Sequence, residues 1–303
     1  MKPKVDLRLP ALRRFAIAIT ALTVLGHSFL GFEQSVAHVF IALLTGYTLE
    51  ILLEWIDAHA HGRKPRFIGD FKNLVDFLLP VHIGSLAVAM LLYPNEQLFP
   101  ISFAVSVLVG SKYIFRVHFE KGSRHFLNPS NTGIATTLIV FPWVGIAPPY
   151  MFTENLYGFA DWLLPLVIII SGTFLNTRFT KRMPLIIAWL LAFAIFAFLR
   201  SLLFGTPLEI ALIPMSGTAF LLFTFYMISD PGTTPFPAVK QAIFGISVAL
   251  VYHLLVGFHI VFGLFFALVI VCSIRGMMMY WRASQEKNIS REKLQVISEE
   301  ASS

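Results

Sequence analysis

The sequence predicts an all-α, polytopic integral membrane protein with about ten transmembrane helices. Of its 303 residues, 56% are hydrophobic and only 13% are charged, whereas about 25% are charged in a typical soluble domain. The mean hydropathy is +0.74. No long polar segment separates two apolar blocks, so we expect one helical membrane domain, residues 1–282. A polar cytoplasmic tail, residues 283–303, should follow as a solvated helix or a disordered segment.

The predicted spans are the apolar runs between polar turns, since about 20 apolar residues cross a bilayer as a helix. The fifth run contains Pro142 and precedes Pro148-Pro149, so we expect this span to be short or broken. The ten predicted spans are Phe15–Phe32, Val36–Ile56, Val75–Tyr93, Pro100–Phe115, Thr132–Ile146, Trp162–Leu175, Leu185–Leu203, Met215–Ile228, Ile243–Val256 and Ile260–Ile274.

The distribution of basic residues predicts the orientation. If the loops alternate between two sides, one side receives 22 of the 23 Lys and Arg residues, and the other receives only Arg200. The positive-inside rule then places both termini in the cytoplasm, and we expect the bacterial cytoplasmic membrane. The membrane accounts for the net charge of +6, so no nucleic-acid partner is predicted. The only cysteine, Cys272, excludes an intrachain disulfide and a cysteine-ligated iron–sulfur cluster built by this chain alone.

Two polar loops resemble helix starts. In Asn128-Pro129-Ser130-Asn131-Thr132 a proline and short polar side chains precede an apolar run, as they do where side chains cap free backbone N–H groups. Asp230-Pro231-Gly232-Thr233-Thr234 is a second loop of this kind. A helix that begins in this way directs its partly positive N-terminus toward whatever lies beside the loop.

These two loops carry a family resemblance. The stretch from Lys112 through Phe115 to Asn128-Pro129 resembles the central signature of the NqrB/RnfD family, which contains membrane subunits of the sodium-pumping NADH:quinone oxidoreductase and of the Rnf complex. The stretch from Ser216 to Pro235 resembles that family's second signature, Asp-Pro-x-Thr/Ser-x-Pro. The resemblance extends from the third to the tenth span. It implies a membrane protein that transfers electrons to a partner protein or a quinone, either with or without coupling to ion movement.

The resemblance also implies a non-covalent flavin, riboflavin or FMN, near the cytoplasmic face. The asparagine of the Asn-Pro pair, and the residue three positions earlier, would contact this flavin. No Ser-Gly-Ala-Thr sequence follows at the family's spacing, and Arg116-Val117 replaces the family's Gly-Gly, so we expect no covalent flavin. The alternative interpretation is that Asn128 and Asp230 only cap helices. The predicted cofactor-binding residues are Lys112, His125, Asn128, Pro129, Ser130, Asn131, Thr132, Asp230, Pro231, Thr233 and Thr234.

Three acidic residues in or near predicted spans are candidates for an ion pathway, because charges at membrane depth are costly. They are Glu50, Glu54 and Asp76. All three lie within a turn or two of a span end, which favours the simpler interpretation that they pair with Arg63, Lys64 or Lys72 near the headgroups.

Histidines do not change this interpretation. His82, His253 and His259 form no convincing pair for a haem, and His59-x-His61 lacks further ligands, so no metal site is predicted. Two other functions remain open. Two loops with polar caps about a hundred residues apart are also typical of a transporter or channel for an ion or a small solute. An accessory membrane protein of a biosynthetic pathway, without redox activity, is the third alternative.

Overall fold

The protein is an all-α polytopic membrane protein. Its structure, a computed structural model, describes residues 8–119, 122–148 and 152–300 and is 74% helical. Lys121 of the basic loop lies outside these residues. Within these residues, seven helical segments are long and apolar enough to cross a bilayer. They are α1 (Arg8–Leu25) with the π-helix η1 (Gly26–Leu30), α2 (Val36–Ala60), α3 (Phe71–Leu91), α6 (Ala160–Arg178), α7 (Met183–Phe204), α10 (Ala238–Gly257) and the first part of α11 (Gly263–Glu300).

Three of the ten predicted spans are too short or too irregular to cross a bilayer as one long, continuous helix. The fourth is α4 (Phe99–Ile114), with 16 residues. The fifth is α5 (Pro129–Val140), which has only 12 residues and ends before Pro142, as the sequence predicts. The eighth is broken, because the segments Leu208–Ser216 and Thr218–Met227 meet at 64°. Pro214 and Gly217 lie at this break, and both residues disfavour a continuous helix.

The broken region consists of four short pieces. In chain order they are α8 (Leu208–Leu212), the 3₁₀ helix η3 (Ile213–Ser216), α9 (Thr218–Leu222) and the π-helix η4 (Phe223–Met227).

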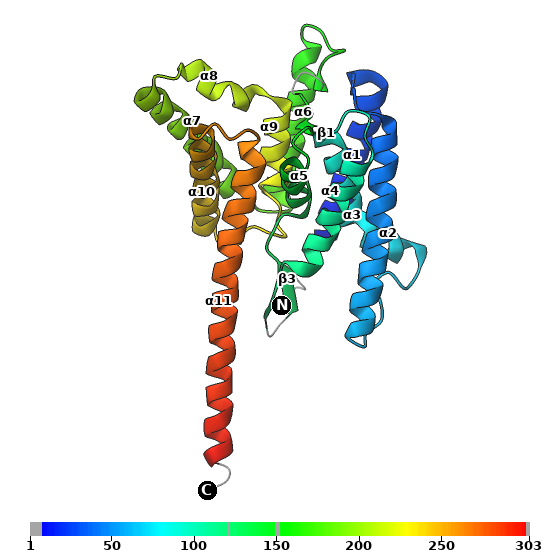
Figure 1. Ribbon diagram of the computed structural model, residues 1–303, viewed down its shortest axis with the longest axis vertical. Helices are drawn as coiled ribbons and strands as arrows, with labels where there is room; N and C mark the ends of the chain where they lie inside the picture. The colour runs from blue at the N-terminus through cyan, green and yellow to red at the C-terminus, as the bar shows by residue number, and fades with distance from the viewer. Residues whose placement is uncertain (1–7, 120–121, 149–151, 301–303) are drawn as a thin grey trace.

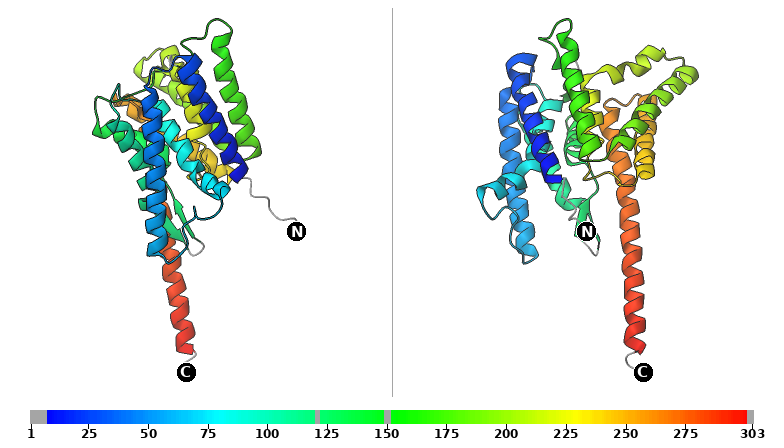
Figure 2. Two further views of the ribbon diagram at one scale, coloured as in Figure 1. Left: turned by 90° about the vertical axis from the view of Figure 1, so that its right-hand side faces the viewer. Right: turned by 180° about the vertical axis from the view of Figure 1, so that it is seen from behind.

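The helices run roughly along one axis, with α5 in the middle of the molecule (Figure 1). α4, α3 and α11 pack against α5, while α7 and α10 form the most extensive helix pair on one side. α1 and α2 pack on α3 on the other side. In both views of Figure 2 α1 also lies beside α6, and the Arg14 guanidinium lies 4.6 Å from the centre of the Phe179 ring.

Glycines allow close contacts between helices. A Cβ on Gly133 of α5 would lie 2.3 Å from the backbone oxygen of Ala104 in α4. A Cβ on Gly245 of α10 would lie 2.7 Å from the backbone oxygen of Leu185 in α7. Small residues at such contacts are typical of helices that pack within a membrane. They let the short helix α5 lie directly against its neighbour.

Two small antiparallel pairs were not predicted. β1 (Leu92–Tyr93) pairs with β4 (Gly145–Ile146) where α3 and α5 lead into their next segments. β2 (Arg116–Phe119) pairs with β3 (Gly122–His125), so the basic loop between α4 and α5 is a β-hairpin. α11 continues without a break past residue 282 to Glu300, and its end projects beyond the other helices (Figure 1). The helix thus continues from the predicted membrane region into the predicted tail, residues 283–303, as far as Glu300.

Candidate functional site

The two predicted loops meet in the structure. Asn128, which precedes the first residue of α5, donates its side-chain N–H to the backbone oxygen of Met227 at 3.0 Å. Met227 is the last residue of η4 and lies just before the second loop. The beginning of α5 thus lies against the end of η4. The predicted flavin site takes residues from both loops, so it requires them to lie close together in this way.

Asn128 is also the N-cap of α5, as its position before Pro129 predicts. Its Oδ1 accepts the backbone N–H of Asn131 at 3.0 Å and the hydroxyl of Ser130 at 3.1 Å. Thr132 donates its hydroxyl to the Asn128 carbonyl at 2.7 Å. Asn128 therefore caps a helix, as the sequence predicts, and its amide joins two segments at the same time.

Asn131 lies in the first turn of α5, and its side chain is buried. Its Nδ2 donates to the backbone oxygen of Phe265 in α11 at 2.9 Å. Its Oδ1 has no hydrogen-bond partner among the described residues. A buried amide oxygen without a donor is uncommon, because its desolvation is then uncompensated.

The second loop is not a helix start, which corrects the prediction for Asp230. α10 begins only at Ala238. The Asp230 carboxylate instead closes a tight turn, in which Oδ1 accepts the Gly232 N–H at 3.0 Å and Oδ2 accepts the Thr233 hydroxyl at 2.9 Å. Thr234 donates its hydroxyl to the Asp230 carbonyl at 2.6 Å. Pro231 and Gly232 favour the turn over a helix.

Three arginines from distant parts of the chain hold this turn; we call Arg124, Arg182 and Arg275 the arginine cluster. Arg124, in β3, donates to the backbone oxygens of Gly232 at 2.8 Å, Pro231 at 3.0 Å and Thr234 at 2.9 Å. Arg275, in α11, donates to the backbone oxygen of Thr233 at 2.5 Å. Carbonyl groups bind guanidinium groups well, but they carry no net charge to balance them.

Arg182 is the most unusual member of the cluster. It is fully buried, and its Nε donates to the Thr234 hydroxyl at 2.8 Å. Its Nη1 has no hydrogen-bond partner among the described residues. Its guanidinium lies 4.5 Å from the centre of the Phe236 ring. Burial, followed by repulsion from Arg124, lowers the pKa of Arg182 to about 10, so the group stays charged at neutral pH.

The cluster has an excess of positive charge. Within the described part of the chain, neither Arg182 nor Arg275 forms an ion pair with a carboxylate, and the turn that they hold contains one acidic residue, Asp230. Buried charge of one sign is costly unless an opposite charge accompanies it. The arrangement therefore suits an anion, and guanidinium groups bind phosphate and carboxylate oxygens especially well.

His125 and Lys112 occupy different surroundings. His125 ends β3, and a Cβ on Gly232 would lie 3.3 Å from its Nε2, so the ring borders the second loop. Lys112 does not contact this loop through a described ion pair. Its Nζ lies 2.5 Å from Glu50 Oε2, and both side chains are largely buried. Lys112 therefore joins α4 to α2.

The three ion-pathway candidates are all paired. Glu54 is fully buried and accepts from Arg63 at 2.5 Å and from Arg66 at 2.6 Å. This ion pairing raises the pKa of Arg63 and of Arg66. Asp76 binds Arg13 of α1 at 2.5 Å. Of the predicted cationic partners, only Arg63 is confirmed. The other partners are Lys112 for Glu50, Arg66 for Glu54 and Arg13 for Asp76.

The sequence predicts the two loops but not the full cluster. Arg182 and Arg275 are basic residues at span ends, and no local pattern shows that they contact the turn at Asp230. An arginine directly before the apolar run of α7, in Lys181-Arg182-Met183-Pro184, is an ordinary membrane-interface pattern.

No family model matches the sequence, and no curated protein matches it. The NqrB/RnfD resemblance therefore rests on the two signature stretches and stays a prediction.

Proposed function

We propose that this protein is a membrane electron-transfer protein that binds a non-covalent flavin, FMN, where the two loops meet. The observation that carries the proposal is the buried Arg182 guanidinium, whose Nη1 lacks a partner among the described residues. Arg124 and Arg275 add two further positive charges around the same turn. A phosphate group supplies several acceptor oxygens and close to two negative charges at neutral pH.

The residues that would hold the cofactor follow from this chemistry. The arginine cluster would hold the phosphate, which favours FMN over riboflavin because riboflavin has no phosphate. Asn131, with its unsatisfied buried Oδ1, is the polar side chain at the start of α5 that still lacks a donor. A bound flavin would supply reversible one- and two-electron chemistry. The protein would bind and orient it, and a partner protein or a quinone would exchange electrons with it.

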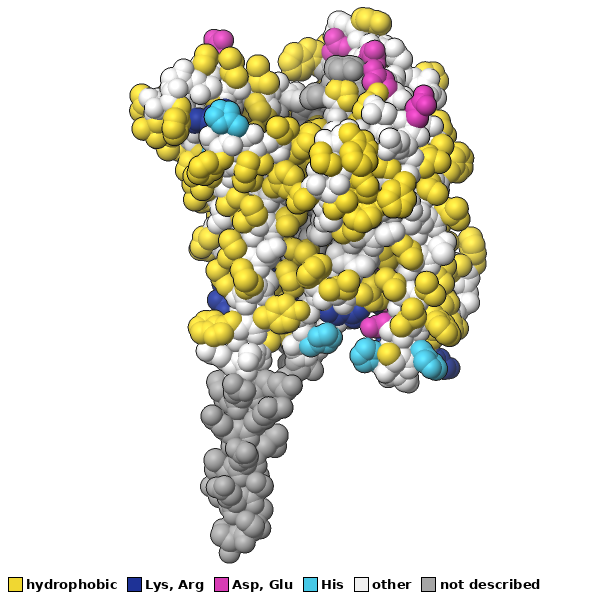
Figure 3. Space-filling model, viewed as in Figure 1, with side chains coloured by type: hydrophobic (Ala, Val, Ile, Leu, Met, Phe, Trp, Pro, Cys, Tyr) yellow, Lys and Arg dark blue, Asp and Glu magenta, His cyan; other side chains and the backbone are white. Residues whose placement is uncertain are grey.

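The orientation of the site forms part of the same proposal. All ten helical segments would cross or enter the membrane, with both termini in the cytoplasm. The strong bias of Lys and Arg to one set of loops supports this topology. On the face drawn in Figure 3, acidic side chains gather at the upper end, and most Lys and Arg side chains lie at the lower end, where α11 projects. The arginine cluster would then face the cytoplasmic side.

The test is an absorbance spectrum of the detergent-purified protein between about 300 and 600 nm, before and after acid precipitation. We expect a flavin double peak that moves to the supernatant, and Arg182→Gln should lose it. Arg178→Gln is the matched control, because Arg178 is exposed at the end of α6. Protein that stays colourless after incubation with FMN would overturn the proposal. Flavin that stays in the pellet would contradict non-covalent binding.

One observation favours a second candidate, a transporter for an anionic solute. The start of α5 and the end of η4 meet inside the bundle, and the segment that leads into η4 bends by 64°. Transporters build binding sites from such interrupted helices. Uptake of radiolabelled phosphate or of a phosphorylated metabolite into proteoliposomes would support this candidate, provided that Arg182→Gln abolishes the uptake.

A further inference from the structure

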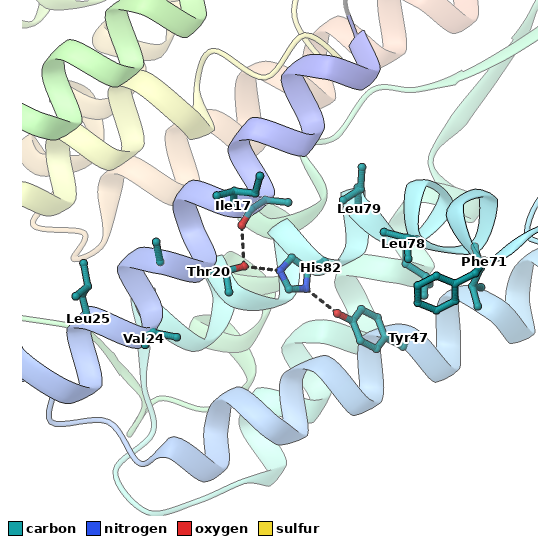
Figure 4. A pocket seen from close by; sticks show the side chains of 13 residues that line it. Ile17, Thr20, Val24, Leu25, Tyr47, Phe71, Leu78, Leu79 and His82 are labelled. Carbon is teal, nitrogen blue, oxygen red and sulfur yellow. Dashed lines mark hydrogen bonds between the residues drawn. The ribbon is translucent and has the colours of Figure 1, made fainter.

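A large apolar cavity lies between α1, α2 and α3, away from the arginine cluster. Its volume is about 890 Å³, which falls in the range of small-molecule sites. Of the 13 residues that line it, only Thr20, Tyr47 and His82 have polar side chains, and one comes from each helix (Figure 4). A cavity between apolar helices would be filled by any lipid chain. The three polar groups require a more specific explanation.

The hydrogen bonds of these groups determine which of them donates. Thr20 Oγ1 lies 2.7 Å from the backbone oxygen of Ala16, which can only accept, so this contact uses the hydroxyl proton. Thr20 must then accept from His82 Nε2, which lies 2.8 Å away. A neutral imidazole with its proton on Nε2 has an acceptor at Nδ1. Tyr47 therefore donates its hydroxyl to His82 Nδ1, at 2.6 Å.

This chain of hydrogen bonds leaves no polar proton for a ligand. The hydroxyl protons of Tyr47 and Thr20 and the ring proton of His82 are all used. Lone pairs remain on the Tyr47 and Thr20 oxygens, and both side chains are only partly buried and line the cavity. The site can therefore accept a hydrogen bond but cannot donate one. A ligand with only acceptors, such as a carbonyl, would gain nothing here.

The cavity opens toward the lipid-facing surface of the helices. Ile17 and Val24 of α1 and Phe71 of α3 line it and are 69%, 60% and 80% exposed. These are apolar side chains on helices that cross the membrane. An occupant would thus enter from the bilayer and not from water.

We infer that this cavity binds an apolar alcohol or phenol from the bilayer, whose hydroxyl group donates to the phenolic oxygen of Tyr47. The apolar body of the ligand fills the space between α1 and α3. Its hydroxyl reaches the only polar region of the lining. This inference is independent of the flavin proposal, because the two sites share no residue.

The test compares farnesol, an isoprenoid alcohol, with its methyl ether, which has the same body but cannot donate. Binding of each radiolabelled probe is measured with the protein in lipid nanodiscs, and protein-free nanodiscs give the background. We expect saturable farnesol binding and an ether that binds about five- to tenfold more weakly, the effect of one lost hydrogen bond. Equal binding of alcohol and ether would overturn the inference.

Three variants separate the hydrogen bond from the cavity. Tyr47→Phe should weaken farnesol to the level of the ether while leaving the ether unchanged. Ala21→Phe, which places a ring into the cavity, should abolish saturable binding of both probes. Tyr93→Phe is the matched control, since the Tyr93 hydroxyl donates to the exposed Glu33 carboxylate and neither residue lines the cavity, and it should change nothing. Farnesol binding that survives Ala21→Phe would place the probe elsewhere and refute the site.

Discussion

Asn128 donates its side-chain amide to the backbone oxygen of Met227, 99 residues later in the chain, at 3.0 Å. The same amide group caps α5 through its oxygen. One buried side chain thereby satisfies a free N–H at the start of one helix and binds a carbonyl at the end of another. The Met227 carbonyl also accepts the backbone N–H of Asp230, at 3.3 Å, so the Asn128 amide gives it a second, shorter hydrogen bond in a water-poor interior. This double role leads to the first prediction.

Asn128→Ala should destabilise the protein more than the loss of an ordinary cap. An N-cap contributes about 1 kcal/mol and a buried hydrogen bond about another 1 kcal/mol, so we expect a loss of about 2 kcal/mol or more. Asn128→Asp keeps the cap but places a carboxylate oxygen against the Met227 carbonyl, and it should also destabilise. Unfolding in detergent, followed by circular dichroism, measures both. An unchanged unfolding midpoint for Asn128→Asp would show that the link to Met227 is unimportant.

The ion pair between Glu50 and Lys112 should depend strongly on both partners. Glu50→Gln leaves a buried ammonium group without its counterion and should cost about 3–5 kcal/mol of unfolding free energy. The double variant Glu50→Leu/Lys112→Met removes both charges and should recover most of this loss. Glu33→Gln, at an exposed position, is the control. Equal stability of the single and double variants would argue against a structural pair.

Gly133→Ala should separate α5 from α4. The new Cβ would lie 2.3 Å from the Ala104 carbonyl oxygen, a backbone atom that cannot rotate away. We expect a loss of about 1–3 kcal/mol, which is typical of overpacking. Gly110→Ala in α4 is a sharp control, because its Cβ meets only a side-chain carbon at 4.0 Å. That variant should be neutral, or more stable by up to about 1 kcal/mol, through its higher helix propensity.

The proposed topology predicts the sides from which cysteines can be labelled. Cys272 is buried, so the labelling of new cysteines can be measured against a low background from the native residue. Lys240→Cys and Glu209→Cys both replace exposed residues. In intact cells, a membrane-impermeant maleimide should label position 209 and not position 240, and permeabilised cells should label both. The reverse pattern would invert the orientation.

Long-range contacts explain why part of the site could not be predicted from the sequence. Apolar runs locate the helices, because a span is a local property, and Pro142 predicted the early end of α5. The turn at Asp230 was taken for a helix start because Asp-Pro fits both structures, and only Pro237, directly before α10, shows where the helix begins. The arginine cluster joins residues 124, 182 and 275 around one turn, and no local pattern encodes that meeting.

The length of α11 connects the turn at Asp230 mechanically to a region beyond the other helices. Arg275, which binds Thr233, and Glu300 belong to one unbroken helix, and 25 residues of helix span about 37 Å. A rigid rod of this length works as a lever. A sideways force on its far end tilts the segment that carries Arg275 and strains its contact with Thr233. A protein that binds the projecting end of α11 would thus strain the contact between Arg275 and Thr233 without contacting the turn at Asp230 itself.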